Sequence, residues 1–219
     1  FEEERELTVL LLIDLSGSTH FGTKTTSKKD LAIEIAATLA FSAMANNDKV
    51  GAILFGDKVQ RFIAPKKAKQ HTLYIVREML SNDAASKQTN YVDAFRMFNN
   101  VCRRKSICFL ISDFLGKGYE DALRVACKKH DVIGIKIYDQ LDMKLPDAGL
   151  LQVADAETGE QRWIDSSSAL VRFEYEKDFH RHNDHVKDVF RRSGADLLHM
   201  RAGDDYVKVL QKFFINRIR

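Results

Sequence analysis

The feature that most constrains this fold is a short apolar run that ends in a cluster of small, oxygen-bearing side chains. The run covers residues 7–13, is rich in Leu, Val and Ile, and does not alternate strictly with polar residues. This pattern is typical of a strand buried on both faces of a parallel sheet. Asp14, Ser16 and Ser18 follow at a spacing of two residues. In open α/β sheets, ligands bind beside the carboxyl ends of the strands, where this loop must lie.

The loop residues Asp14, Ser16 and Ser18 can turn their oxygens toward one point. One carboxylate and two hydroxyls form a hard-oxygen set, which suits magnesium or manganese rather than zinc or copper. The same residue types are also common in turns and at helix amino termini. The pattern alone therefore leaves a metal site and an ordinary turn both open.

Length and composition indicate a globular chain. Its 219 residues are 45% hydrophobic and 30% charged, which fits one α/β domain. We expect a core at about 5–140 and 195–219, with an inserted hairpin and long helix at about 145–194. The chain contains no run of about 18 apolar residues, so no membrane span is predicted. We expect a cytoplasmic domain. The start at Phe1 suggests a piece of a longer protein, which leaves an upstream membrane anchor open.

Charge and cysteine content favour neither nucleic acid nor zinc. The net charge is +3, and the basic clusters at 66–69 and 103–105 are short and lack interleaved aromatic residues. Such clusters are typical of solvated faces, so no nucleic-acid partner is predicted. Cys102, Cys108 and Cys127 are odd in number and match no zinc spacing. We expect reduced, partly buried thiols.

Strands and helices are predicted to alternate along the chain. Short apolar runs predict strands, and helical periodicity predicts helices. The strands are expected at about 50–55, 59–63, 106–111, 132–138 and 196–200, and the helices at about 28–45, 69–80, 91–102, 118–129, 167–192 and 204–218. This order predicts right-handed βαβ units in a doubly wound, mostly parallel α/β sheet.

Local signals add detail to this α/β sheet. Ser27 and Asp30 form a predicted capping box at the start of the first helix. Gly56-Asp57 predicts a hairpin turn, and therefore one antiparallel edge strand. The segments at 150–153 and 161–164 predict a separate β-hairpin, which would be followed by the long helix.

Two further oxygen-bearing residues are expected at the same edge as Asp14. Thr89 precedes a helix, and Asp113 directly follows the strand at 106–111. That strand should lie beside the strand at 7–13 near the centre of the sheet, which would bring the three loops together. The order D-x-S-x-S, then Thr, then Asp resembles the metal ion-dependent adhesion site (MIDAS) of von Willebrand factor type A (vWA) domains.

Other segments resemble one bacterial branch of that fold. They are Thr89-Asn90, residues 110–114, residues 130–132, Leu145-Pro146 and residues 155–159. Together they are similar to the vWA family catalogued as domain-of-unknown-function family 58, and the resemblance covers the whole chain. It implies a Rossmann-like vWA fold and a protein-binding module rather than an enzyme. Members are commonly encoded beside MoxR-type AAA+ ATPases, which implies such an ATPase as a partner.

The resemblance also implies a set of metal ligands. Asp14, Ser16, Ser18, Thr89 and Asp113 would hold a divalent cation, directly or through water. The cation would be Mg²⁺, or alternatively Mn²⁺ or Ca²⁺. Because magnesium keeps several waters when few protein ligands are supplied, a carboxylate of a partner protein could replace one of them.

Three other functions were weighed against the binding module. A metal-dependent hydrolase or phosphotransferase could use Asp14 and Asp113, but the chain has no G-x-x-x-x-G-K-[ST] and no second Asp two residues after Asp14. Nucleotide binding is weakly indicated, because Gly17 stands alone rather than in G-x-G-x-x-G. A nucleophilic Ser16 or Ser18 would need the absent G-x-S-x-G elbow.

The remaining histidines and aromatic residues are interpreted structurally. His180, His182 and His185 lie in the predicted long helix, but the spacing fixes no third ligand, so we expect a solvated face. His20 is expected in a surface loop near the proposed metal ligands. Four aromatic residues are expected to pack within the added hairpin and helix: Trp163, Phe173, Tyr175 and Phe179.

Overall fold

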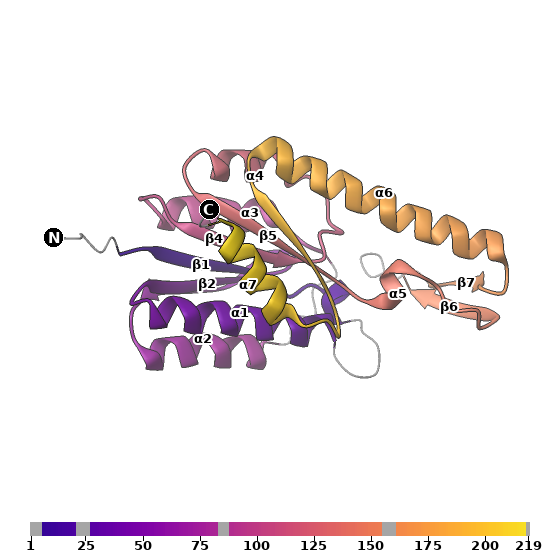
Figure 1. The fold of residues 1–219 in the computed structure, drawn as a ribbon, viewed down its shortest axis with the longest axis horizontal. Coiled ribbons are helices and arrows are strands. Elements are labelled where there is room, and N and C mark those ends of the chain that lie inside the picture. Colours follow the sequence, from indigo (N-terminus) through magenta and orange to yellow (C-terminus); the bar gives the residue numbers. More distant parts are fainter. Residues whose placement is uncertain (1–5, 21–26, 83–87, 155–160, 218–219) are drawn as a thin grey trace.

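The structure is a computed structural model that describes residues 6–20, 27–82, 88–154 and 161–217. Its central element is a six-stranded sheet with the order β3-β2-β1-β4-β5-β8 (Figure 1). The strands are β1 (Thr8–Asp14), β2 (Lys49–Phe55), β3 (Val59–Lys66), β4 (Ile107–Ser112), β5 (Asp131–Tyr138) and β8 (Asp196–Arg201). Only β2 and β3 pair antiparallel, and the other neighbours are parallel. The predicted sheet is confirmed, including its antiparallel edge and the central pairing of β1 with β4.

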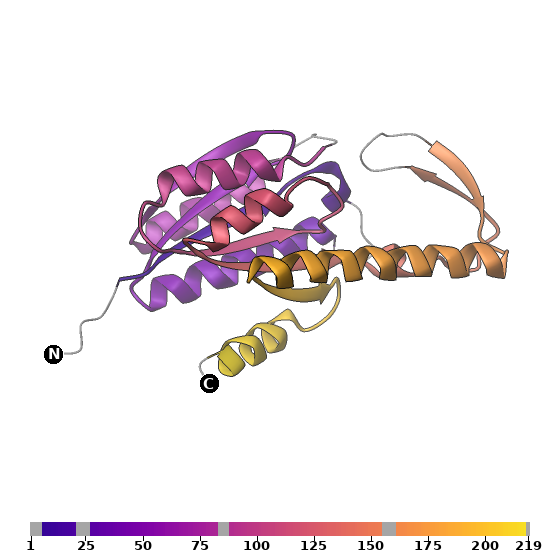
Figure 2. The same cartoon turned by 90° about the horizontal axis from the view of Figure 1, so that it is seen from above.

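Helices cover both faces of this sheet, as Figure 2 shows from above. One face carries α1 (Lys28–Ala45), α2 (Lys69–Ser81) and α7 (Tyr206–Arg217), and the other carries α3 (Tyr91–Val101), α4 (Glu120–Cys127) and α6 (Ala169–Ser193). Strand β1 contributes to both cores, because side chains alternate between the faces of a strand. Leu11 packs in the α1 core and Leu12 in the α3 core, and both are fully buried. This explains the continuous apolar run.

Helix α1 begins as its sequence predicts. Ser27 is the N-cap, and its side chain accepts from the backbone N–H of Asp30 while the Asp30 carboxylate accepts from the Ser27 N–H. The helix is apolar on most sides, so it is buried along most of its length. The capping box therefore fixes where the first turn of α1 meets the carboxyl edge of the sheet.

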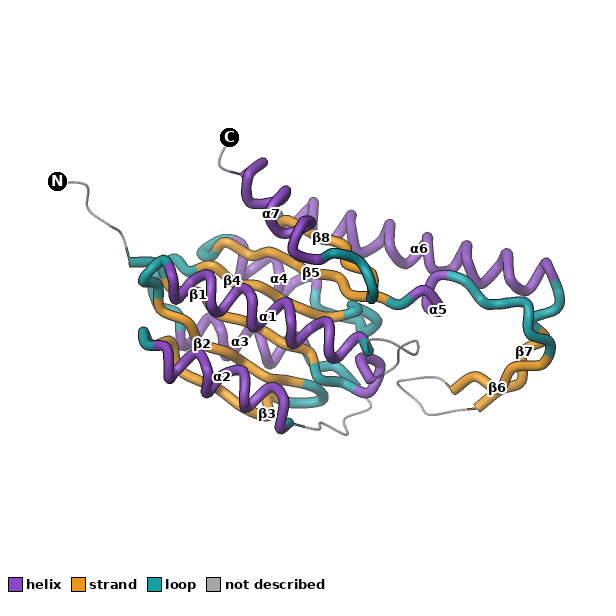
Figure 3. Tube along the Cα trace, turned by 60° about the horizontal axis from the view of Figure 1, so that its bottom comes forward, coloured by secondary structure: helices purple, strands orange, loops and turns teal. Residues whose placement is uncertain are grey.

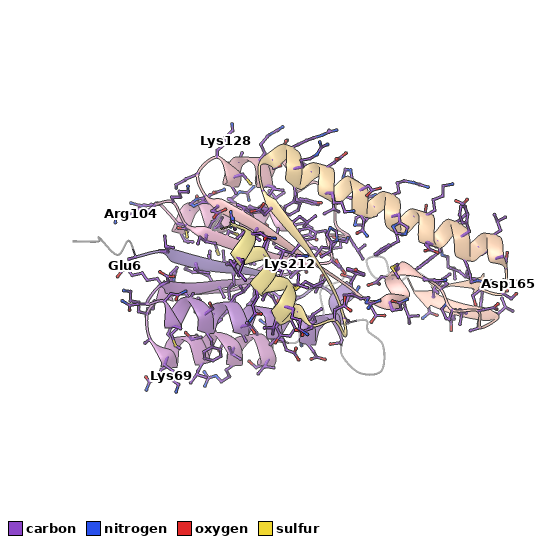
Figure 4. The ribbon with its side chains drawn as sticks, in the orientation of Figure 1. Glu6, Lys69, Arg104, Lys128, Asp165 and Lys212 are labelled. Carbon is purple, nitrogen blue, oxygen red and sulfur yellow. The ribbon has the colours of Figure 1, made fainter. Side chains whose placement is uncertain are left out.

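An arm extends beyond the carboxyl ends of the strands (Figure 3). We use "arm" for the hairpin of β6 (Leu150–Ala154) and β7 (Gln161–Asp165) together with the first half of α6. The two strands pair antiparallel in a sheet of their own, which confirms the predicted hairpin. The residues that connect the two strands, 155–160, lie outside the described residues. In Figure 4, Asp165 marks the far end of the arm, whereas Glu6 and Arg104 lie at the opposite end of the molecule.

Several sequence predictions about local structure were wrong. The structure has a 3-10 helix at Gly17–His20 and a short α-helix, α5 (Gln140–Met143), neither of which was predicted. Trp163 and Phe173 were expected to be packed but are 66% and 60% exposed, because the described residues do not cover them. The packing prediction holds for the other two aromatic residues of the arm, of which Tyr175 donates from its hydroxyl to the Leu141 carbonyl and Phe179 packs on Tyr138.

Two predictions from composition can also be compared with the fold. Cys102, Cys108 and Cys127 are all free thiols, with the first two buried and the third partly buried, as expected. Among the helices in the described ranges, none is both long and apolar enough to cross a membrane.

Candidate metal centre

The loop after β1 folds its oxygen-bearing side chains back on one another. Asp14 ends the strand and is fully buried, and Ser16 and Ser18 are 1% and 5% exposed. The backbone N–H of Ser16 donates to Asp14 Oδ1 at 2.9 Å. The hydroxyl oxygens of Ser16 and Ser18 lie 3.2 Å apart. The spacing of two residues thus places a carboxylate and two hydroxyls in one buried loop.

The loop after β4 joins the same cluster. The Ser112 hydroxyl donates to Asp14 Oδ2 at 2.6 Å, and the Tyr91 hydroxyl lies 2.8 Å from Ser112 Oγ. Because a serine has one hydroxyl proton and Ser112 uses it on Asp14, Tyr91 must be the donor to Ser112. Asp113 follows and is 3% exposed. A chain of hydrogen bonds therefore ties β1, β4 and α3 together beside Asp113.

Thr89 lies at the rim of this cluster. A Cβ built on Gly116 would come within 3.4 Å of Thr89 Cβ and 2.9 Å of the Tyr91 ring, so the missing side chain of Gly116 lets the loop after Asp113 pass close to Thr89. Thr89 itself lines a shallow pocket with Lys117, not the cavities that Ser18 and Asp113 line.

Asp14 is a buried carboxylate without a cationic partner. Among the described residues, none forms an ion pair with it. Burial and, to a lesser degree, the negative charge of Asp113 together raise the pKa of Asp14 to about 6, although hydrogen bonds from Ser112 and Ser16 oppose the shift. The cluster therefore has an excess of negative charge at Asp14, which a cation would relieve.

Asp113, in contrast, already has a cationic partner. Lys28 is 1% exposed, and its Nζ lies 3.3 Å from Asp113 Oδ2 and 3.1 Å from Asp142 Oδ2. Burial by itself would lower the pKa of Lys28, but the two carboxylates together raise it above its ordinary value. The ammonium is therefore charged at neutral pH.

Two cavities flank this ion pair. One of about 310 Å³ is lined by Asp113, Lys136 and His182. The other, of about 520 Å³, is lined by Ser18, by apolar residues of the arm such as Leu151, and by apolar residues that follow α5 such as Leu145. Lys28, Leu115, Asp142 and Tyr175 line both cavities. The site is therefore open toward the arm.

Two residues of the first cavity were not predicted to lie at the site. Lys136 is 1% exposed and donates from Nζ to the Asp113 carbonyl oxygen at 2.8 Å, and burial lowers its pKa to about 8. His182 is partly buried, so the prediction of a solvated face was wrong for it, although His180 and His185 are about 60% exposed. Burial, together with Lys136, lowers the pKa of His182 to about 4.

The residues present fit a hard divalent cation. The five predicted ligands offer only oxygen atoms, and the Asp14 carboxylate accepts from the Ser112 side chain and from the Ser16 backbone and side chain, which leaves lone pairs for a cation. In the described part of the chain there is no cluster of three or more His, Cys, Asp or Glu residues that could hold a metal ion. A cation here would thus depend on hydroxyl ligands as well as on the two carboxylates, of which Asp113 is already paired with Lys28.

The sheet order, the flanking helices and the Asp-Ser-Ser loop define a vWA-like domain. The VWA domain of SpRpn10 superposes with a TM-score of 0.54 at 11% identity, covering 91% of this chain and 90% of that one. The conserved hypothetical protein BatB from Bacteroides thetaiotaomicron gives 0.60 at 14% identity, with 96% and 98% covered. An aerotolerance-related membrane protein from Bacteroides fragilis gives 0.57 at 14% identity, with 94% and 96% covered.

The chain belongs to the family described as "Protein of unknown function DUF58", whose profile matches residues 1–185. The uncharacterized protein Rv1480 of Mycobacterium tuberculosis is 29% identical over 219 residues, which is 99% of this chain and 69% of that protein. The uncharacterized protein Mb1516 of Mycobacterium bovis matches to the same extent. The family and the fold suggested by the sequence are thereby confirmed.

The site residues that were not predicted differ in how clearly the sequence marks them. Lys136 interrupts an apolar strand near its carboxyl end, and a charged residue there is a readable sign of a polar site. Lys28 has no such sign, because a lysine at the start of a helix is expected to be exposed. Its partner Asp142 is 114 residues away and lies in a helix that was not predicted.

Proposed function

We propose that this domain is a non-enzymatic protein-binding module that uses a divalent cation to grip an acidic side chain of a partner. Asp14, Ser16, Ser18, Thr89 and Asp113 would hold the cation, with Mg²⁺ as the first candidate and Mn²⁺ or Ca²⁺ as alternatives. The cation would keep waters at the coordination positions that the protein does not fill, and a carboxylate of the partner would replace one of these waters.

The single observation that supports this proposal most is the state of Asp14. This carboxylate is fully buried, has no ion-pair partner among the described residues, and accepts hydrogen bonds from Ser112 and from the Ser16 backbone. Burying a carboxylate without a counter-charge is costly, and a bound cation offsets that cost. Ser16 and Ser18 add two hydroxyl oxygens on the same loop.

The same geometry favours a ligand over a nucleophile. Both carboxylate oxygens of Asp14 are held by donors, and the side chain is not exposed to a substrate. A hydrolase or phosphotransferase that used Asp14 would need it to approach a reacting phosphorus or carbonyl carbon. The binding module is therefore the better account of these residues.

The partner is proposed from the family resemblance. A MoxR-type AAA+ ATPase is the first candidate, since members of family 58 are commonly encoded beside one. The carboxyl edge of the sheet would face it, together with the cavity of about 520 Å³ between Ser18 and the arm. A partner that places an acidic residue at the cation and an apolar residue in this cavity would match both surfaces.

The test is calorimetric titration of Mg²⁺ and Mn²⁺ into the metal-stripped protein and into its Asp14→Ala variant. We expect the variant to bind at least about a hundredfold more weakly, because even residues outside the ligand shell cost roughly ten- to a hundredfold when changed. Asp184→Ala removes an exposed aspartate of α6 and is the matched control, with binding unchanged. Equal binding by the parent and Asp14→Ala would contradict the assignment.

A further inference from the structure

The cation nearest to the proposed metal ligands is part of the chain itself. The side chain of Lys28 is 2% exposed, and its ammonium lies 3.3 Å from Asp113 Oδ2. The same ammonium lies 3.1 Å from Asp142 Oδ2, whose side chain is 25% exposed. An ammonium so deeply buried between two carboxylates is part of the site, unlike the exposed ion pairs of the molecular surface.

Both ends of this ion pair are held in place by local structure. Lys28 is the first residue of α1, whose start is fixed by the Ser27 capping box. Asp142 belongs to the capping box of α5, where its Oδ2 accepts from the backbone N–H of Asp139 at 2.7 Å. Asp142 can therefore keep Lys28 as a partner even if Asp113 is taken by another cation.

Lys28 also borders both cavities beside the proposed ligands. Asp113 lines the cavity of about 310 Å³, Ser18 lines the cavity of about 520 Å³, and Lys28 and Asp142 line both. A cation shared by Asp113 and the Asp14 loop would therefore meet the Lys28 side chain. A buried ammonium and a divalent cation repel each other strongly at such short range.

We propose that Lys28 is an intramolecular competitor of the divalent cation: its ammonium occupies Asp113 when the metal is absent and withdraws to Asp142 when the metal binds. This inference rests on the proposed metal-dependent function. The exchange would also reach the arm, because the Tyr175 hydroxyl of α6 donates to the Leu141 carbonyl oxygen of α5 at 2.9 Å. Metal binding and the position of α5 would then be coupled, and the coupling would act in both directions.

The first test compares Mg²⁺ and Mn²⁺ titrations of the parent and of Lys28→Met. We expect Lys28→Met to bind the cation about tenfold more tightly or better, because a competing buried charge has been removed. Lys144→Met removes the same charge from an exposed position next to α5 and should change affinity by less than about twofold, as expected for screened surface charge. Thermal unfolding confirms that each variant is folded, and Lys28→Gln replaces Lys28→Met if the latter does not fold.

A second variant, Asp142→Asn, should change the metal affinity in the opposite direction. It removes one of the two carboxylates beside Lys28, so the ammonium holds Asp113 more firmly and metal binding should weaken. In the Lys28→Met background the same change should have little effect, and this double-mutant cycle separates competition from a general loss of negative charge. Amide hydrogen exchange at 139–143 follows the exchange in the parent itself: it should change on adding Mn²⁺, and not in Lys28→Met.

The outcomes distinguish this inference from the function on which it rests. Tighter binding by Lys28→Met, including binding that the parent lacks, supports the competitor. Equal or weaker binding by Lys28→Met, with metal bound by the parent and lost in Asp14→Ala, overturns the competitor and leaves the metal site standing. If the parent, Lys28→Met and Lys28→Gln all fail to bind the metal, both the competitor and the metal site are overturned.

Discussion

At the scale of single residues, the site is a set of buried polar groups in which the two negative charges are balanced to different degrees. Asp113 is neutralised by Lys28, whereas Asp14, within the described part of the chain, is held by hydrogen bonds from neutral donors and pairs with no cation. The positive φ of Phe114, at 57°, is a further constraint, because non-glycine residues seldom adopt it. The buried Phe114 ring packs against Tyr91 and Phe190, which holds the loop after Asp113 in this conformation.

A buried histidine away from the site leads to a prediction about acid stability. His130 is 4% exposed and packs on Phe98 at 4.4 Å between ring centroids, and neither of its ring nitrogens has a hydrogen-bond partner among the described residues. Burial lowers its pKa from 6.5 to about 4. Between these values the unfolded chain binds the proton and the folded chain does not, so stability is present above pH 6.5 and is lost as the pH falls toward 4.

We therefore expect His130→Phe to reduce the loss of stability between pH 7.5 and pH 5. The measurement is urea unfolding of the parent and the variant at both pH values. Some pH dependence should remain, because burial also lowers the pKa of His182 and of His199 to about 4. An equal change in unfolding free energy for both proteins would show that His130 does not contribute.

Sequence reasoning succeeded for residues that directly end a strand. Asp14 and Asp113 follow apolar runs, and the ends of parallel strands meet at one edge whatever the details of the loops. It failed for Lys28 and Asp142, because their contact depends on a short helix and on a chain separation of 114 residues. It also placed Trp163 in a packed setting, since the sequence does not tell how many layers cover a hairpin.

At the scale of elements, the arm is anchored by the contact of α6 with β5. Gly134 has no side chain, and a Cβ there would lie 2.3 Å from Phe190 Cε1 and 2.9 Å from Leu197 Cδ1. Phe190 is 1% exposed and its ring is enclosed by Phe114 and Tyr119, so it has little room to move. The close approach of α6 to the sheet therefore depends on this glycine.

We expect Gly134→Ala to destabilise the protein by about 1–3 kcal/mol, the usual cost of overpacking a filled core. Urea unfolding at pH 7.5 measures the change. Leu170→Ala serves as the control, because Leu170 lies on the same helix but is 69% exposed, and its replacement should cost no more than about 0.5 kcal/mol. A fully stable Gly134→Ala would mean that α6 is not held in this way.

At the scale of the whole molecule, the site, the Lys28 ion pair and the arm lie at or beyond the carboxyl edge of the sheet. Strands β1 and β4 place the proposed ligands at the carboxyl edge, and the arm projects beyond that same edge (Figures 1 and 3). Through Lys28, Asp142 and Leu141, buried and partly buried contacts lead from the ligand cluster to α6. The fold thus connects the proposed cation site to the surface that would meet a partner.

The most direct test of the central claim is to locate the cation in the folded protein. Mn²⁺ added to the isotope-labelled parent broadens the amide NMR signals nearest to it. The account predicts that signals of residues 14–18, 89 and 112–116 disappear first, and that excess Mg²⁺ restores them. Broadening centred on the histidines of α6, or spread over the exposed carboxylates, would contradict a metal site formed by Asp14 and Asp113.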